Sequence, residues 1–290
     1  MAVGVRSRAG LTRRSMLRAA SLAGLPMPVL GQDRPAIVLG LTPVVVDSDL
    51  ELLQAMEREL GGTLGTRVSL VKRRTYQEIT AMLLAGQVTA AWICGFPYVR
   101  HRDQLSILVT PLYRGAPLYQ SYIIARADLP GETIEAFRGK SHAFSDPDSN
   151  SGWLVTNHLL SRMGTSAERF FSRTFFTYGH RNVVRAVGSG LADTGSVDGY
   201  VWDVLAEREP ELTRQTRIVR RSERFGFPPI ACLTSASKTA DVTRLGSALE
   251  GLAGTASGRA VLDMLRLDGF APEDAALFDP IARMWQDIQG

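Results

Sequence analysis

Eight small, mostly polar residues, Ser145 to Gly152, form the stretch of this sequence best suited to bind a ligand. Apolar side chains recur after it with helical spacing, which predicts a helix that begins at Ser149, Asn150 and Ser151. The first N–H groups of a helix have no partner inside it, and the helix dipole adds a partial positive charge there. With hydroxyl and amide side chains beside those groups, the turn could bind an anion without any Lys or Arg.

The same turn has a second interpretation, an ordinary helix cap, because Ser and Asn are preferred at the capping position. Gly152 would let a ligand approach the backbone closely, since glycine has no side chain. The choice between an anion site and a simple cap depends on the remainder of the chain.

The composition is that of a soluble globular protein. With 290 residues, 45% of them hydrophobic and 21% charged, the chain is long enough for two domains that each bury a core. The formal net charge is +4, but residues 1–31 contain five arginines and no acid, which leaves −1 for the rest. A near-neutral body does not favour binding to nucleic acid.

The basic N-terminus is predicted to be an export signal of the twin-arginine type. Arg13 and Arg14 stand in the pattern Thr-Arg-Arg-Ser-Met-Leu, and about a dozen apolar or small residues follow. Cleavage after Gly31 would start the mature chain near Gln32, so we expect a periplasmic protein. No cysteine stands directly after the apolar run, where a lipid could be attached. No later segment reaches the ~18 apolar residues of a membrane span. We therefore expect no lipid anchor and no stable membrane insertion of the mature chain.

The sequence contains two cysteines, Cys94 and Cys232, both in apolar contexts typical of strands. In an exported protein they could form a disulfide, and two buried thiols are equally compatible with the sequence. Their spacing suggests no metal site, and we expect no cofactor.

From residue 36 onward the chain alternates short apolar runs with helical patterns. This alternation predicts an α/β fold in which mostly parallel sheets are flanked by helices. The predicted strands span residues 36–41, 67–71, 88–93, 106–111, 118–125, 141–144, 174–178, 193–197, 216–219 and 230–234.

Polar residues follow the carboxyl ends of several predicted strands. They are Thr42, Tyr98, Ser149 to Ser151, His180 and Asp198. Because open parallel sheets bind ligands beyond these strand ends, the convergence favours a binding site over a simple cap.

Five segments, in this order, resemble the phosphate, phosphite and phosphonate periplasmic-binding proteins, the solute receptors of ABC importers. The segments are Tyr76-Gln77-Glu78, Gly95 to Tyr98, Asp146 to Gly152, Gly179-His180, and Ala192 to Gly195 with Asp198. The similarity extends over most of residues 36–288, and the serine-rich turn with the downstream Gly-His is its most specific part.

The resemblance implies a two-lobed type II periplasmic-binding fold, each lobe a mostly parallel sheet flanked by helices. Such proteins close on their ligand by a hinge motion. Lobe one would comprise residues 34–120 and 226–290, and lobe two residues 121–225, with two crossings between them.

The resemblance also implies roles for matching residues in the second lobe. Ser149, Asn150 and Ser151 would hold the oxygens of a phosphonate or phosphate, and Asn150 stands where the family usually has threonine. His180 would donate to the same anion. Asp198 would accept a hydrogen bond from a protonated anion or contact the ligand's substituent, although taken alone it is better explained by a structural role than by ligand contact.

From the first lobe, the resemblance implies that Tyr76 and Tyr98 add phenol hydroxyls when the lobes close. Taken alone, Tyr76 fits ordinary packing better. Family members that bind amino-substituted phosphonates carry a further acid near the second crossing, where this chain has Phe225 to Pro229. The nearest acid is Glu223, so an ammonium-bearing ligand is not expected. The segment Cys94 to Tyr98 is also shorter than the usual form.

The sequence contains no nucleophile elbow, no phosphate-binding P-loop and no His-Glu-x-x-His pattern, so we expect no enzyme. We predict an exported, monomeric receptor that captures a small oxyanion of the phosphonate, phosphite or phosphate type for an ABC permease. Two alternatives stay open at this point. The protein could present its ligand to a membrane sensor kinase, or it could be an enzyme of binding-protein fold that acts on a small carboxylate.

Overall fold

The computed structural model describes residues 1–4, 37–42 and 50–289. By its internal contacts the chain divides into two units, residues 1–34 and 35–290. The predicted leader falls in the first unit, and beyond residues 1–4 both the leader and the predicted cleavage site near Gln32 lie outside the described residues. The helices and strands of the described residues all lie in the second unit.

The first sheet has six strands in the spatial order β11-β4-β10-β3-β1-β2. β1 pairs in parallel with β2 and β3, whereas β10 and β11 run antiparallel to their neighbours. The bounds are β1 (Ile37–Leu41), β2 (Val68–Lys72), β3 (Ala90–Trp92), β4 (Leu105–Leu112), β10 (Ile230–Leu233) and β11 (Gly269–Ala271).

The second sheet has five strands in the order β7-β6-β8-β5-β9. β6 pairs in parallel with β7 and β8, and β5 runs antiparallel to β8 and β9. The bounds are β5 (Leu118–Arg126), β6 (Ser141–Phe144), β7 (Arg173–Phe176), β8 (Thr194–Asp198) and β9 (Thr216–Gly226). Both sheets therefore contain parallel and antiparallel pairs, and are not mostly parallel as predicted. Parallel neighbours in one sheet must be joined by a long, usually helical connection, whereas β4 and β5, and likewise β9 and β10, are joined directly by short crossings between the sheets.

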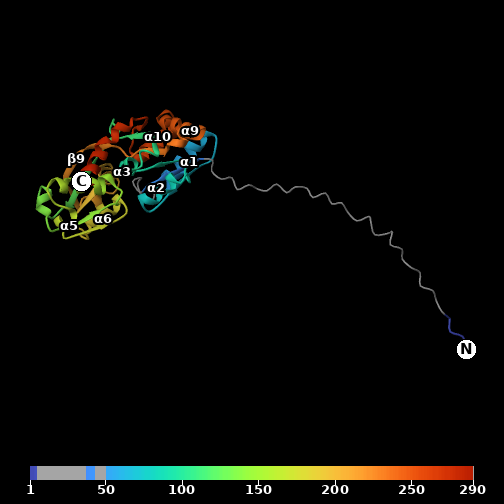
Figure 1. The fold of residues 1–290 in the computed structure, drawn as a ribbon, viewed down its shortest axis with the longest axis horizontal. Coiled ribbons are helices and arrows are strands. Elements are labelled where there is room, and N and C mark those ends of the chain that lie inside the picture. The colour runs from blue at the N-terminus through green and yellow to red at the C-terminus, as the bar shows by residue number, and fades with distance from the viewer. Residues whose placement is uncertain (5–36, 43–49, 290) are drawn as a thin grey trace. The chain divides into compact units, whose positions relative to one another are not determined.

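Helices flank both sheets. Figure 1 shows α1 and α2 near α9 and α10 on one part of this unit, with α5 and α6 on another. The helices beside the first sheet therefore come from both halves of the sequence. The α-helices are α1 (Leu50–Leu64), α2 (Tyr76–Leu84), α3 (Gly95–Arg100), α4 (Val155–Arg162), α5 (Ala167–Phe170), α6 (His180–Gly188), α7 (Gly199–Arg208), α8 (Pro210–Thr213), α9 (Ala240–Glu250), α10 (Ala256–Leu265) and α11 (Asp279–Gln289). Single helical turns are η1 (Ile134–Phe137), η2 (Asn150–Leu154), η3 (Thr234–Ala236), η4 (Gly251–Gly254) and η5 (Ala275–Phe278).

Three elements differ from the sequence-based expectations. The spacing of apolar residues from Leu50 predicts a helix that stops at Gly61 and Gly62, but α1 continues to Leu64, because the burial of Leu60 and Leu64 outweighs the cost of glycine in a helix. The helix predicted over residues 129–139 is only the short turn η1. The sequence predicts a loop over residues 94–98, but Gly95–Arg100 form α3 instead.

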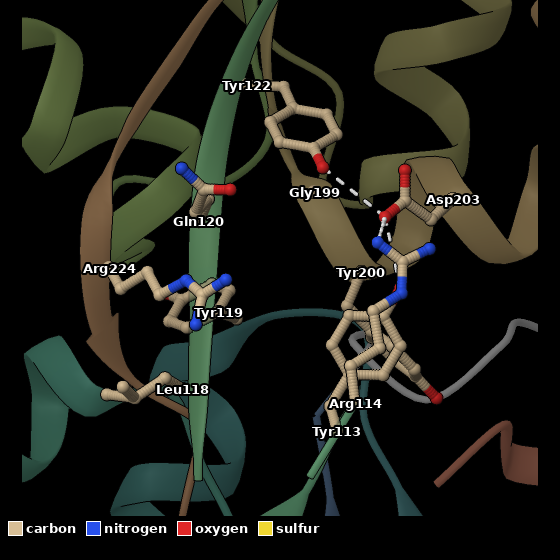
Figure 2. A pocket seen from close by; sticks show the side chains of 10 residues that line it. All are labelled: Tyr113, Arg114, Leu118, Tyr119, Gln120, Tyr122, Gly199, Tyr200, Asp203 and Arg224. Atoms are coloured by element: carbon tan, nitrogen blue, oxygen red, sulfur yellow. Dashed lines mark hydrogen bonds and ion pairs between the residues drawn. The ribbon is translucent and has the colours of Figure 1, made fainter. Parts of the chain in front are cut away.

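Two crossings join the sheets, residues 113–117 between β4 and β5 and residues 227–229 between β9 and β10. They lie side by side, since the Phe227 N–H donates to the Pro117 carbonyl at 2.8 Å. Asp203 of α7 accepts hydrogen bonds from Tyr113 (3.0 Å) and Tyr122 (3.3 Å), and Arg114 forms an ion pair with it at 3.0 Å (Figure 2). These contacts hold the first crossing against the second sheet, around a cavity of about 50 Å³.

No helix in the described part of the chain is both long enough and apolar enough to cross a membrane.

Candidate ligand-binding site

The serine-rich turn begins a helix, as predicted. β6 ends at Phe144, and Ser149 caps the π-helical turn η2, its Oγ accepting a hydrogen bond from the Gly152 N–H at 2.9 Å. α4 follows directly from η2. Ser149, Asn150 and Ser151 are at most 1% exposed, so the turn lies inside the protein and not on its surface.

Gly152 has a different role from the one expected. A Cβ added at Gly152 would lie 1.8 Å from Ser145 Oγ and 2.7 Å from Ser145 Cβ, so glycine is required by its neighbour in the same turn. Because the Gly152 N–H already donates to Ser149, this amide is not available to a ligand.

Asn150 links the turn to the first sheet and to β5. Its backbone N–H donates to Cys94 Sγ at 3.2 Å, at the end of β3, and its side-chain Nδ2 donates to the Tyr119 hydroxyl at 2.9 Å. Burial raises the pKa of the Cys94 thiol to about 12, so the sulfur acts as a neutral acceptor. The turn therefore lies between groups that come from both sheets.

Three buried polar atoms of this turn have no hydrogen-bond partner among the described residues: Ser145 Oγ, Asn150 Oδ1 and Ser151 Oγ. An unsatisfied buried polar group costs about 1–3 kcal/mol, and native proteins contain few of them. Two hydroxyls that can donate and one amide oxygen that can accept would together suit a small oxyanion that carries a proton.

Tyr76 of α2 and His180 of α6 meet at this site. The Tyr76 hydroxyl lies 3.1 Å from His180 Nε2, while His180 Nδ1 accepts the Asp198 N–H at 3.1 Å. Because Nδ1 accepts, the neutral ring carries its proton on Nε2 and donates it to Tyr76. Burial lowers the pKa of His180 to about 3, which keeps the ring neutral.

The Tyr76 hydroxyl is thereby left to donate its own proton. Burial is the largest of the effects that raise the pKa of Tyr76, followed by the nearby Cys94, Asp146 and Asp198, so the hydroxyl stays protonated. His180 therefore positions Tyr76. The resemblance implied that His180 donates a hydrogen bond to the anion, but both of its ring nitrogens already have partners.

Asp146 fastens α2 to the turn, a role that the sequence analysis did not assign. Its carboxylate accepts hydrogen bonds from the Asp148 N–H (2.8 Å), the Tyr76 N–H (3.3 Å) and the Gln77 side chain (3.4 Å). Asp148 in turn forms an ion pair with Arg100 of α3 at 2.7 Å. Contacts of this kind bring α2 and α3, beside the first sheet, directly against the turn that follows β6.

Asp198 caps α7, with its Oδ1 accepting from the N–H groups of Tyr200 (2.9 Å) and Val201 (3.3 Å). Burial raises the pKa of this carboxyl to about 7, against the opposing effect of those hydrogen bonds. Asp198 thus has a structural role as the cap of α7, and its contact with a ligand stays a prediction.

Residues 39–278 match the model of the family described as "ABC transporter, phosphonate, periplasmic substrate-binding protein". That match covers most of the chain. The chain belongs to this family. The sequence-based resemblance is therefore confirmed.

Individual relatives agree with this assignment. The chain is 28% identical to the phosphate-import protein PhnD of Mycolicibacterium smegmatis over 66% of its own length and 65% of that protein's length. PhnD1 of Prochlorococcus marinus, solved in complex with methylphosphonate, superposes with a TM-score of 0.78 at 15% identity, over 87% of this chain and 98% of PhnD1. A binding-protein component of an ABC phosphonate transporter from Pseudomonas aeruginosa gives 0.79 at 20% identity, over 89% and 87%. These structures share the type II periplasmic-binding fold, which confirms the predicted fold class.

Tyr98, predicted for the site, lies elsewhere in this member of the phosphonate-binding family. Tyr98 packs its ring edge-on against Phe278, and its hydroxyl is near Arg102, Asp274 and Asp279. The reason is that Gly95 to Arg100 form α3, which turns Tyr98 away from the end of β3.

Thr42, also predicted for the site, donates its hydroxyl hydrogen to the Trp92 carbonyl at 3.0 Å and so joins the ends of β1 and β3. It is fully buried, at the strand ends where a ligand site was predicted, but its proton is already used.

Tyr119 supplies a phenol that the sequence analysis did not identify. It lies on β5, only 3% exposed, and contacts Asn150 through its hydroxyl. Burial, with smaller contributions from Cys94 and Asp198, raises the pKa of Tyr119, and the adjacent Asn150 and Ser151 side chains oppose that shift. The Ser151 hydroxyl is thus close to Tyr119 without reaching hydrogen-bond geometry.

Both cysteines are free and buried, which settles the choice that the sequence left open. Burial raises the pKa of Cys232 to about 11, and its thiol lies 3.8 Å from the Ser106 carbonyl. No group of three or more His, Cys, Asp or Glu side chains in the described ranges could hold a metal ion.

Proposed function

We propose that this protein captures a small phosphorus oxyanion, of the phosphonate, phosphite or phosphate type, for an ABC importer. The observation that carries the proposal is the set of unpartnered buried atoms Ser145 Oγ, Asn150 Oδ1 and Ser151 Oγ in a single turn at a helix start. Family membership and the methylphosphonate complex of PhnD1 support a phosphonate as the natural class of ligand.

In this proposal Ser149, Asn150 and Ser151 form one wall of the site, and Tyr76 and Tyr119 add phenol groups beside it. Ser151 and Tyr76 would donate to the anion's charged oxygens, and Asn150 Oδ1 would accept its proton. A monoanion is favoured because the site offers no Lys or Arg side chain among these residues.

Binding would close two lobes, residues 34–120 with 226–290 and residues 121–225. The hydrogen bond between Tyr76 and His180 and that between Asn150 and Cys94 both join elements of the two sheets, so each would form as the lobes meet. A membrane permease would then bind the closed form. We also propose that the protein is exported to the periplasm by the twin-arginine route.

The geometry lends no support to a catalytic serine. Both ring nitrogens of His180 are committed, one to Tyr76 and one to the Asp198 N–H, so the ring is not arranged to take a proton from Ser149 or Ser151. We therefore propose a receptor and not an enzyme.

A thermal-shift panel tests the proposal. It compares phosphate, phosphite, methylphosphonate and ethylphosphonate with sulfate and simple carboxylates. A ligand present at 100 times its dissociation constant adds about 2.7 kcal/mol to the free energy of unfolding, which shifts the melting temperature measurably. We expect stabilisation by phosphorus oxyanions only. Stabilisation by carboxylates alone, or release of an altered ligand on incubation, would favour the enzyme alternative.

A further inference from the structure

A groove of about 730 Å³ lies between the segment that leads from β2 into α2 and the segment that leads from β7 into α6. Several of its lining residues are close in sequence to Tyr76 and His180, the two residues that meet at the proposed site. Its lining residues are Lys72, Arg73, Arg74, Thr75, Glu78, Thr177, Tyr178 and Asn182.

One side of this groove is strongly basic. Lys72, Arg73 and Arg74 are consecutive, and none of them forms an ion pair with a carboxylate among the described residues. The one hydrogen bond that their charged ends make to the described residues runs from Arg73 Nη1 to the Lys72 carbonyl at 2.9 Å, and Arg73 is also close enough to Glu78 to help lower the pKa of that carboxyl. Two exposed guanidinium groups beside an ammonium group create a positive potential that attracts anions.

The one carboxylate of the groove is already engaged. Glu78 accepts hydrogen bonds from the backbone N–H groups of Arg74 and Thr75, at 3.0 Å each, and from the Thr75 hydroxyl at 3.2 Å. The backbone hydrogen bond from Thr75 is the main reason that the pKa of Glu78 is lowered. With three cations against this single anion, the lining keeps a positive charge.

The opposite side presents an exposed aromatic ring in a strained conformation. Tyr178 has a φ of +54°, and its side chain is 47% exposed. A bulky non-glycine residue in the left-handed region costs on the order of 1 kcal/mol, and such strain tends to persist where it serves function. Tyr178 lines the groove together with Arg73 and Arg74 and lies two residues before His180.

From these observations we propose that the groove is a second anion site, distinct from the serine-rich turn. It binds an acidic group between Arg73 and Arg74 on one side and Tyr178 on the other. The acidic group is either the far end of a phosphonate that carries a second acid or a separate small anion. In both cases the anion touches segments beside both sheets and stabilises the closed arrangement. The first case rests on the function proposed above.

Binding measurements with the variant Arg73→Gln/Arg74→Gln test this inference. The control is Arg169→Gln/Arg214→Gln, which removes the same charge from exposed arginines outside the groove. The ligands are methylphosphonate, which has one acidic group, and phosphonoacetate and 3-phosphonopropionate, which have two. If the groove holds the far acid, the groove variant weakens binding of the two-acid ligands about fivefold or more, and methylphosphonate binding changes less than twofold.

A second arm tests a separate anion without relying on any phosphonate. Citrate at fixed ionic strength is titrated into each variant, and the melting temperature is recorded. A rise of the melting temperature in the parent and control proteins that is absent from the groove variant supports a free anion at this site. Equal behaviour of all three proteins toward citrate and toward the two-acid ligands would overturn the inference. Failure of methylphosphonate to bind at all would count against the proposed function and leave the citrate arm to decide on the groove.

Discussion

The hydroxyl of Tyr76 lies 3.1 Å from Nε2 of His180, and this contact joins helix α2 beside the first sheet to helix α6 beside the second. Since His180 Nδ1 accepts the Asp198 N–H, the imidazole donates to Tyr76, and the phenol proton is directed elsewhere. A histidine that looks like a ligand-binding residue thus acts on a tyrosine, which is the better candidate for contact with an anion.

Replacing Tyr76 by Phe tests that relationship. The variant keeps the buried ring and loses the donor, so we expect its affinity for methylphosphonate to fall about tenfold. The matched control is Tyr98→Phe, whose ring packs on Phe278 away from the site, and it should bind like the parent protein. Calorimetric titration of both variants measures the difference. A loss in Tyr98→Phe that equals the loss in Tyr76→Phe would contradict the geometry.

The pH dependence of stability should change in Asp198→Asn. Asp198 has a raised pKa of about 7, so the folded state holds its proton more tightly than the unfolded state, and this stability grows as pH falls from 7 toward 4. The pKa values of His180 and His142 are both lowered to about 3, so their contribution to the free energy of unfolding decreases as the pH falls below 6.5. Asp198 therefore offsets part of the acid destabilisation.

Asparagine keeps the cap on α7 but cannot titrate. We expect the free energy of unfolding of the Asp198→Asn variant to fall more steeply on acidification, by up to about 1.4 kcal/mol per pH unit between pH 6.5 and 4. Urea unfolding at pH 7, 6 and 5 measures the slope. Parallel curves for the variant and the parent protein would show that Asp198 is not protonated in the fold.

Gly152 and Ser145 should be coupled. Gly152→Ala places a methyl group 1.8 Å from Ser145 Oγ, so the turn must shift, and we expect a loss of about 1–3 kcal/mol in the free energy of unfolding together with weaker ligand binding. Adding Ser145→Gly removes the clashing side chain and should restore most of that loss. A double-mutant cycle by chemical unfolding measures the coupling, and strictly additive effects would mean that the two residues are not in contact.

Asp203 is expected to stabilise the first crossing. Its carboxylate accepts from Tyr113 and Tyr122 and pairs with Arg114, as Figure 2 shows. Asp203→Asn removes the charge and should lower the free energy of unfolding by about 1–2 kcal/mol, because hydrogen bonds to a charged partner are the stronger ones. The selectivity among oxyanions, measured by the same thermal-shift panel, should not change. A change of ligand preference would place Asp203 in the binding site.

Local signals explain why the serine-rich turn could be predicted from the sequence. The capping preference of Ser149 and the apolar spacing after it are read from adjacent residues, and the structure has Ser149 at the cap of η2. Most strands were likewise predictable, because short apolar runs between turn residues are typical of buried strands.

The rest of the site depends on contacts between distant parts of the chain. Asn150 reaches Tyr119, 31 positions away, and nothing in the apolar run of β5 separates Tyr119 from an ordinary core residue. Tyr98 lies away from its predicted place because α3 has only six residues, with Pro97 near its start, and so short a segment carries no helical periodicity that would distinguish it from a loop. The mixed strand directions likewise follow from the crossings, which no local pattern encodes.

The most direct test of the central claim is the affinity of Ser151→Ala for methylphosphonate, compared with that of Thr110→Val. Both variants remove a buried hydroxyl that has no hydrogen-bond partner among the described residues, but Thr110 lies on β4, outside the serine-rich turn. If the turn binds the anion, calorimetry will show that Ser151→Ala loses about tenfold or more in affinity while Thr110→Val binds like the parent protein. Undiminished binding by Ser151→Ala, or equal losses in both variants, would contradict an anion site at this turn.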